Sequence, residues 1–184
     1  KYAQYYNPEQ IAALMGNYGG TFYGIGVYID NDGNTDITQV DNCIIRGNAK
    51  VGGQVYGGGI SARNAVITNC QILNNNATYG AGLGLRYGVY GVNVFNSLIA
   101  GNSGNYSAGV YGDDASDTLF NVTVVHNTSS SGSNGAGVGG NNCSVINSII
   151  WGNMFNYTPN NVGANVNLYN CSHSLKLNGD NFIS

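Results

Sequence analysis

The chain has 184 residues, a length that fits one domain; 42% of the residues are hydrophobic, only 8% are charged, and the formal net charge is -3. Six Lys and Arg residues cannot form the basic surface that duplex DNA or RNA requires, which excludes nucleic-acid binding. No uninterrupted apolar run approaches the roughly 20 residues that span a bilayer, so we expect no membrane insertion.

The first segment, residues 1–22, is expected to form an N-terminal cap or a degenerate coil of the solenoid. Asn7 followed by Pro8 resembles the start of a helix, with Asn as the N-cap, and the pattern predicts a short helix that ends near Met15. In the alternative interpretation, residues 11–17 align with the repeated phrase described below and form a degenerate repeat unit.

An acidic segment follows, in which carboxylates and an amide stand at alternate positions: Asp30, Asp32, Asn34 and Asp36. Calcium prefers several oxygen ligands from one flexible turn, so these residues are a candidate Ca²⁺ site. The segment departs from the EF-hand pattern, because Gly33 comes two positions early and a bidentate Glu has no counterpart. The alternative interpretation is a solvated turn between two strands.

From residue 42 onward the chain repeats a phrase that begins and ends with Asn and has apolar residues between. The first Asn of each copy lies 25 to 27 residues after the first Asn of the copy before. Within each copy the second Asn follows the first by six residues: Asn42/Asn48, Asn69/Asn75, Asn96/Asn102, Asn121/Asn127 and Asn147/Asn153. A second phrase of the form Gly-x-Gly plus an aliphatic residue, usually preceded by Tyr, keeps the same period. Such a period predicts a solenoid.

The content of each unit predicts strands and not helices. Short apolar pieces alternate with polar residues, β-branched side chains dominate, and Gly or Asn interrupts every few residues. We therefore expect coils of about three short strands, stacked in parallel about 4.8 Å apart. The predicted fold is all-β, a parallel β-helix of about five to six coils over residues 23–170.

The repeated Asn residues have a structural explanation. Asn tolerates the left-handed conformation of a sharp bend, and its amide both donates and accepts hydrogen bonds. We therefore expect two inward ladders, one formed by Asn42, Asn69, Asn96, Asn121 and Asn147, the other by Asn48, Asn75, Asn102, Asn127 and Asn153. Between them run two apolar columns, 44/72/98/123/149 and 45/73/99/124/150, of which one should be core.

The motif Asn-Cys/Ser-x-Ile-x-Gly-Asn, followed by Gly-x-Gly and an aliphatic residue, resembles right-handed parallel β-helix proteins of the pectate-lyase-like superfamily, in particular bacterial cell-surface β-helix proteins. The resemblance covers roughly residues 23–170. It implies a right-handed helix. The family's catalytic motif is not visible, so no catalytic residue is carried over.

Stacking the loops after each Gly-x-Gly strand predicts one edge with the order acid, base, base, acid. The acids of the first coil are followed by Arg63, Arg86 and then by Asp113, Asp114 and Asp117. This edge could bind or degrade a polysaccharide, as the resemblance implies, or could simply keep the solenoid soluble. A column of Tyr23, Tyr56, Tyr79 and Tyr106 is expected to stack and to stabilise the coils, with a sugar-binding platform as the alternative.

Four cysteines have no metal-ligand spacing, and Cys43, Cys70 and Cys171 fall in one column, where buried free thiols are expected rather than disulfides; Cys143 stands apart. Of the seven Asn-x-Ser/Thr sequons, Asn76, Asn105 and Asn156 are expected in exposed loops that could carry glycans, whereas Asn121, Asn127 and Asn170 are expected to face inward. His126 is expected to have a structural role in a bend.

Residues 171–184 are expected to be a last partial coil or a truncated end. We expect a non-enzymatic structural or adhesive module outside the cell or at its surface, because Asn, Gly and Tyr replace the usual charged residues. Its expected partners are copies of itself stacked end to end, flanking domains of a longer protein, or glycans. The alternative is a polysaccharide-binding or polysaccharide-degrading module, a lyase or glycoside hydrolase.

Overall fold

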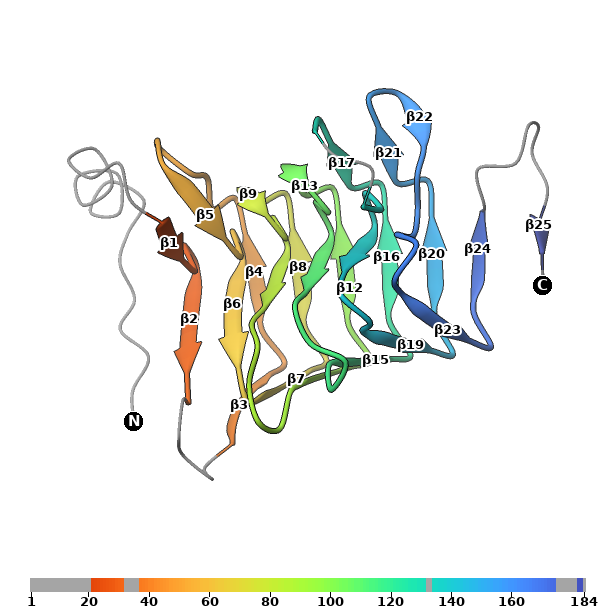
Figure 1. The fold of residues 1–184 in the computed structure, drawn as a ribbon. Helices are drawn as coiled ribbons and strands as arrows, with labels where there is room; N and C mark the ends of the chain where they lie inside the picture. The colour runs from red at the N-terminus through yellow and green to blue at the C-terminus, as the bar shows by residue number, and fades with distance from the viewer. Residues whose placement is uncertain (1–20, 32–36, 132–133, 175–181, 184) are drawn as a thin grey trace.

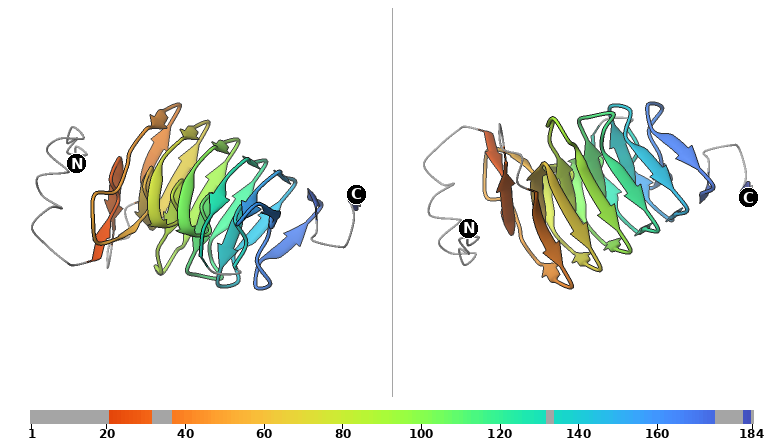
Figure 2. Two further views of the ribbon diagram at one scale, coloured as in Figure 1. Left: turned by 90° about the horizontal axis from the view of Figure 1, so that it is seen from above. Right: turned by 90° about the horizontal axis from the view of Figure 1, so that it is seen from below.

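The computed structural model describes residues 21–31, 37–131, 134–174 and 182–183. Within these ranges the fold is all-β, a parallel solenoid of about five turns without a helix (Figure 1). Figure 2 shows, from above and below, that the coils follow one another along a single axis. The expected helix at residues 7–15 and the alternative degenerate coil at residues 11–17 both lie outside the described residues.

Each full coil contains four short strands instead of the predicted three, so the solenoid has four sheets, called A to D. Sheet A consists of β1 (Thr21–Tyr23), β5 (Gln54–Tyr56), β9 (Asn76–Tyr79), β13 (Ser103–Tyr106), β17 (Thr128–Ser129), β21 (Met154–Phe155) and β22 (Thr158–Pro159). Sheet B consists of β2 (Val27–Asp30), β6 (Ile60–Arg63), β10 (Leu83–Leu85), β14 (Val110–Gly112) and β18 (Val138–Gly140).

Sheets C and D complete the coil. Sheet C consists of β3 (Thr38–Asp41), β7 (Ala65–Thr68), β11 (Val92–Phe95), β15 (Thr118–Phe120), β19 (Ser144–Ile146) and β23 (Asn167–Tyr169). Sheet D consists of β4 (Ile44–Arg46), β8 (Gln71–Leu73), β12 (Leu98–Ala100), β16 (Thr123–Val125), β20 (Ile149–Trp151), β24 (Ser172–Ser174) and β25 (Phe182–Ile183). All pairings are parallel except β21–β22 and β24–β25.

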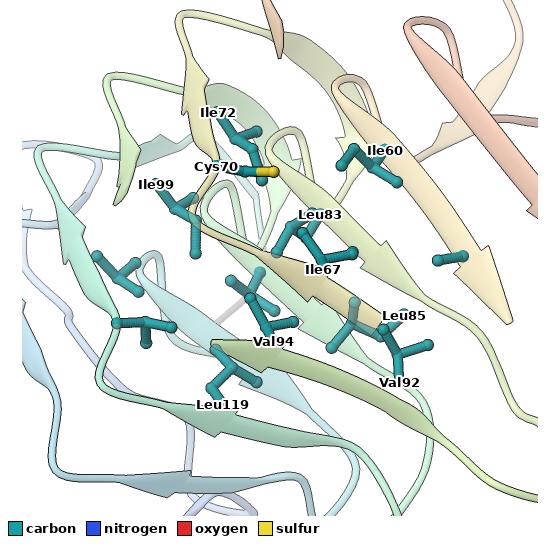
Figure 3. Packing of buried hydrophobic residues seen from close by; sticks show 14 of the residues in the cluster. Ile60, Ile67, Cys70, Ile72, Leu83, Leu85, Val92, Val94, Ile99 and Leu119 are labelled. Atoms are coloured by element: carbon teal, nitrogen blue, oxygen red, sulfur yellow. The ribbon is translucent and has the colours of Figure 1, made fainter. Parts of the chain in front are cut away.

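The core is a stack of aliphatic side chains from sheets B, C and D (Figure 3). Sheet D contributes the inner column Ile45, Ile72, Ile99, Val124 and Ile150, all buried. The predicted columns were wrong by one residue in the second coil, since Gln71 pairs with Ile44 in the outer column and Leu73 faces outward with it. The alternation of the short strand decides this register, because only one residue of each three can point inward.

The second Asn column forms the predicted inward ladder. From Asn48 to Asn153 the members are stacked coil by coil, and each Nδ2 donates to the Oδ1 of the next at 2.8–3.0 Å. The same Oδ1 also accepts the backbone N–H of the preceding ladder residue. From Asn75 to Asn153, each Nδ2 uses its other N–H to donate to a backbone carbonyl of the coil before, as Asn102 does to Ile72. The ladder continues to Asn161, a buried residue that the repeat did not predict.

The first Asn column corrects the sequence prediction, because its side chains are exposed instead of buried. Its members all have φ near +50°, and a residue in this conformation at a corner directs its Cβ away from the interior: Asn42, Asn69, Asn96, Asn121 and Asn147. Only scattered surface bonds link them, such as Asn121 Nδ2 to Asn96 Oδ1 at 3.4 Å. The bend before the second ladder is also left-handed in every coil, with His126 at φ 55° in the place that Gly or Asn holds elsewhere.

The Ser or Cys that follows the first-column Asn in every coil except that of Asn121, where Val122 stands, closes the corner through its side chain. Ser97 Oγ donates to the carbonyl of Phe95 at 2.7 Å and accepts the backbone N–H of Cys70 at 3.0 Å. Cys70 Sγ lies 3.1 Å from the carbonyl oxygen of Thr68 in the same arrangement. All four cysteines are free thiols, as predicted for Cys43, Cys70 and Cys171; Cys70 and Cys143 are buried, whereas Cys43 and Cys171 are half-buried and not buried as expected. A thiol therefore acts here as a weaker substitute for the serine hydroxyl.

The ladder should be the most sensitive polar feature of the fold. Asn102→Ala should lower the free energy of unfolding by about 3 kcal/mol or more, because it leaves the Asn75 N–H and the Ile72 carbonyl buried without partners, at roughly 1–3 kcal/mol each. Urea denaturation followed by circular dichroism measures this. Asn96→Gly, at an exposed corner with φ 49°, is the matched control and should change stability by less than about 1 kcal/mol. Equal losses in the two variants would contradict the assignment.

Candidate functional site

The candidate site lies on the outer face of sheet B and on the loops that join sheet B to sheet C. Register brings Asp30 beside Arg63, and backbone hydrogen bonds place Arg86 and then Asp113 in the following coils. The order acid, base, base, acid predicted from the sequence is therefore present. This order arises because the sheet B strands of successive coils are paired in the same register. The charged residue therefore lies at the same outward position in each of these coils, two residues after the middle of the strand.

Arg86 lies at the centre of this face and reaches back over two coils. Its Nη1 donates to the Tyr28 hydroxyl at 2.9 Å and lies 3.3 Å from Asp30 Oδ2, while its Cζ lies 4.0 Å from the centroid of the Tyr23 ring. Partial burial alone would lower the pKa of Arg86, but the Tyr28 and Asp30 interactions raise it. The guanidinium therefore stays charged, in a cation–π and hydrogen-bonded setting.

Asp30 forms ion pairs with both Arg63 and Arg86. Its Oδ1 lies 3.5 Å from Arg63 Nη1, and its Oδ2 accepts the Tyr28 hydroxyl at 2.6 Å as well as Arg86. Burial alone would raise the pKa of Asp30, but the Tyr28 hydrogen bond and the two arginines together lower it. Both carboxylate oxygens are thus already engaged with side chains of this face.

The remaining calcium candidates, Asp32, Asn34 and Asp36, lie outside the described residues. Within the ranges that the structure describes, no group of three or more His, Cys, Asp or Glu side chains is arranged to hold a metal ion. The calcium site therefore stays a prediction, and a cation there would compete with Arg63 and Arg86 for Asp30. Thermal unfolding with and without calcium, compared between the wild type and an Asp32→Asn/Asp36→Asn variant, would test it.

The predicted tyrosine column stacks as expected. Ring centroids are 5.5 Å apart for Tyr23–Tyr56, 4.4 Å for Tyr56–Tyr79 and 4.8 Å for Tyr79–Tyr106, and Tyr111 meets Tyr79 edge-on at 5.4 Å. The faces of the inner rings are therefore occupied by one another. This favours the stabilising interpretation over an open sugar-binding platform at this column.

The acidic end of the edge is a turn that packs on the loop of the coil before it. Asp114 accepts the backbone N–H of Ser116 at 3.1 Å through Oδ1 and that of Gly88 at 3.4 Å through Oδ2. Burial, and to a smaller extent Asp114, raises the pKa of Asp113, although a hydrogen bond from Tyr111 opposes the shift. Burial and the neighbouring Asp113 raise the pKa of Tyr111 to about 12.

Asp117 is fully buried, which the sequence did not predict. Its Oδ1 accepts the backbone N–H of Val92 at 2.9 Å, while Oδ2 has no hydrogen-bond partner among the described residues. Burial raises the pKa of Asp117 to about 7, and the nearby Asp114 and Asp113 act in the same direction. Burial, with the added field of Asp117, also raises the pKa of the Cys143 thiol to about 12.

The sequon asparagines differ in accessibility. The expectation of exposed loops is wrong for Asn76 and Asn105, which lie in β9 and β13 and are half-buried. Asn76 donates its amide to Ser103, and Asn105 accepts the Lys50 ammonium at 3.3 Å. Asn156 is exposed in the β21–β22 turn. Asn127 faces inward as predicted, but Asn121 and Asn170 are exposed, because they belong to the outward corner column.

Comparisons with protein-family models, with curated proteins and with solved structures find no match to this chain. Among the described residues no helix is long and apolar enough to cross a membrane. The geometry of this face and its loops is therefore what the functional argument rests on.

Asp117 should make stability fall between mildly acidic and neutral pH. Its pKa is 3.8 in the unfolded chain and about 7 in the folded one, so the native state holds a proton that the unfolded state releases between these values. The stability from this group is complete below pH 4 and is lost as the pH rises to 7. Asp117→Asn keeps an Oδ1 acceptor for Val92 and cannot ionise, so it should be roughly 2–4 kcal/mol more stable than the wild type at pH 8.

Urea denaturation of both proteins at pH 4, 6 and 8 measures this difference, which should shrink toward pH 4. Parallel stability profiles over the whole range would contradict an ionisable buried Asp117.

Proposed function

We propose that the protein is a non-enzymatic structural or adhesive module that acts outside the cell or at its surface. The observation that carries the proposal is that the charged side chains along the sheet B edge, and the tyrosines stacked on sheet A, are already engaged with their neighbours in the solenoid. Asp30 is shared by Arg63 and Arg86, and the tyrosine rings stack in sequence. Side chains used in this way hold coils in register and are poorly placed to exchange protons with a substrate.

The composition supports the proposed location. A surface with few Lys and Glu residues depends on Asn, Ser, Thr and Tyr for its contact with water, and it keeps a regular column with 8% charged residues soluble. Continuous parallel sheets along one axis also make a stiff spacer, because every coil is hydrogen-bonded to the coils before and after it.

A second candidate is polysaccharide binding, with membership of the pectate-lyase-like superfamily as the wider proposal. The observation in its favour is that Tyr23 and Tyr28 keep 39% and 45% of their surface exposed beside the Arg86 guanidinium. Degradation is less well supported than binding. A lyase needs a neutral group that removes a proton, and the raised pKa of Arg86 leaves even less of its guanidine in the neutral form than in a free arginine.

End-to-end self-association, which the sequence predicts, is less well supported than adhesion through the side of the solenoid. At the C-terminal end of the described coils, sheets A and D finish in the antiparallel strands β22 and β25, and β22 contains Pro159, which lacks a donor. A like coil that continued these two sheets would meet a reversed strand, whereas sheet C ends in the parallel strand β23. This geometry favours adhesion through the side of the solenoid over growth from this end.

The enzymatic alternative is tested by incubation with polygalacturonate and alginate, with and without calcium. We expect neither unsaturated products, followed by ultraviolet absorbance, nor new reducing ends. Calcium-dependent cleavage that is lost in Arg86→Gln would contradict a non-enzymatic module and would support the degrading alternative. The same preparations, examined by sedimentation velocity over a wide concentration range, measure end-to-end association.

A further inference from the structure

The loop at residues 86–91 is an insertion in the candidate edge that lies outside the strands of the stacked sheets. It joins β10 of sheet B to β11 of sheet C. In the preceding coil the same connection, from β6 to β7, consists of Asn64 alone. The insertion projects as the yellow-green loop at the lower edge of Figure 1. It carries three strongly exposed side chains, with 71%, 73% and 50% of their surface accessible: Tyr87, Val89 and Tyr90.

The backbone of this loop is held in place by its neighbours on both sides. Tyr90 N donates to Asn64 Oδ1 at 2.9 Å, and Gly88 N donates to Asp114 Oδ2 at 3.4 Å. Gly91 takes φ 65°, and a Cβ at Gly88 would lie 2.5 Å from Asn64 Oδ1. The loop is thus fixed by the coils before and after it, so a ligand that binds it has little ordering entropy to overcome.

The two tyrosines on the loop differ from those of the stacked column. The ring contacts within the described residues involve the column, Tyr28, Tyr111 and a Phe pair, and include neither Tyr87 nor Tyr90. Much of their surface, 71% for Tyr87 and 50% for Tyr90, is accessible to a ligand. Rigid aromatic side chains with free faces supply large contact areas at a low entropic cost, and the C–H faces of sugar rings are natural partners for them.

The charges around the loop restrict the ligand. Two cations lie beside the loop, Arg63 next to Gly88 and Arg86 at its start, and both are paired with Asp30. Asp113 and Asp114 flank the loop on its other side. The protein as a whole has a net charge of -3. An acidic polysaccharide would meet carboxylates here without a free cation to balance its own charge, whereas an uncharged one would meet only stacking and polar contacts.

We propose that the loop at residues 86–91 binds an uncharged polysaccharide, whose sugar rings stack on Tyr87 and Tyr90. This inference rests on the proposed adhesive function and names its ligand class and its contact site. It differs from the polysaccharide alternative above, which places the ligand on the Asp30–Arg86 edge. Binding should be nearly independent of salt, since no ion pair with the ligand contributes to it.

Affinity electrophoresis of the full chain in native gels tests the proposal. The gels contain one uncharged polymer each, namely hydroxyethylcellulose, galactomannan, xyloglucan or dextran, and polygalacturonate and alginate serve as charged comparisons. We expect at least one uncharged polymer to retard the wild type, with the same apparent affinity at low and high salt. Tyr87→Ala and Tyr90→Ala should each weaken that affinity about tenfold, as expected for the loss of one stacked ring.

Two controls separate stacking from other effects. Tyr157→Ala removes a tyrosine that is 93% exposed in the β21–β22 turn on sheet A and should bind like the wild type. A Tyr87→Phe/Tyr90→Phe variant keeps both ring faces and should retain most of the affinity. Circular dichroism confirms that all variants are folded.

Three outcomes would overturn the inference: no retardation by any uncharged polymer, retardation by the acidic polymers alone, or equal losses in Tyr157→Ala and the loop variants. Failure of the inference is distinguishable from failure of the proposed function. If the retarding polymer is bound equally well by the loop variants, the adhesive function holds and the site is elsewhere. If the protein cleaves the polymer, the non-enzymatic function fails whatever the loop does.

Discussion

The fold depends on one buried column of amides. Every coil turns a sharp corner inside a narrow column, and the backbone groups at that corner need partners that water cannot supply. The ladder from Asn48 to Asn161 provides them, with each amide bonded to its neighbours in the ladder. The four members from Asn75 to Asn153 each also donate to a carbonyl of the previous coil. The Gly-x-Gly phrase faces this ladder across the interior. A Cβ at Gly59 would lie 2.9 Å from Asn75 Nδ2, and one at Gly82 would lie 3.0 Å from Asn102 Nδ2, so the two repeated phrases require each other.

Much of the fold could be predicted because repetition carries long-range information. A phrase that recurs every two dozen residues specifies which strands are neighbours and in what register, which a non-repeating sequence does not reveal. What could not be predicted is the orientation of side chains at the corners. Asn42 and Asn48 belong to the same phrase, but the left-handed residue points outward and the residue after the second bend points inward. The register error in the second coil was avoidable, because Gln71 and Ile72 follow Asn69 at the same spacing at which Ile44 and Ile45 follow Asn42.

The candidate site was predictable in its order but not in its bonding. In-register stacking dictates the order of Asp30, Arg63, Arg86 and Asp113 along the edge, since each occupies the same place in its coil. The partner that Arg86 selects depends on the length of its side chain and on the tyrosine rings beneath it, and it crosses a coil to reach Asp30. Asp117 lies in a run of acidic and small residues that is typical of a solvated turn. Only the structure places it in the column that holds Val92 and Cys143 in the adjacent coils.

This arrangement separates the parts of the chain that build the column from those that are free to act. Side chains on the sheets are repeated every coil, so a ring or a charge there meets its own copy and is used in stacking, as the tyrosines and the Asp30–Arg63 pair are. Residues inserted between sheets have no copy above or below them. The connection from sheet B to sheet C in the coil that contains β10 has such an insertion, with two tyrosines that do not stack on other rings. The coils on either side supply the hydrogen bonds that fix this insertion. Specificity in such a solenoid therefore belongs to the places where the repeat is broken.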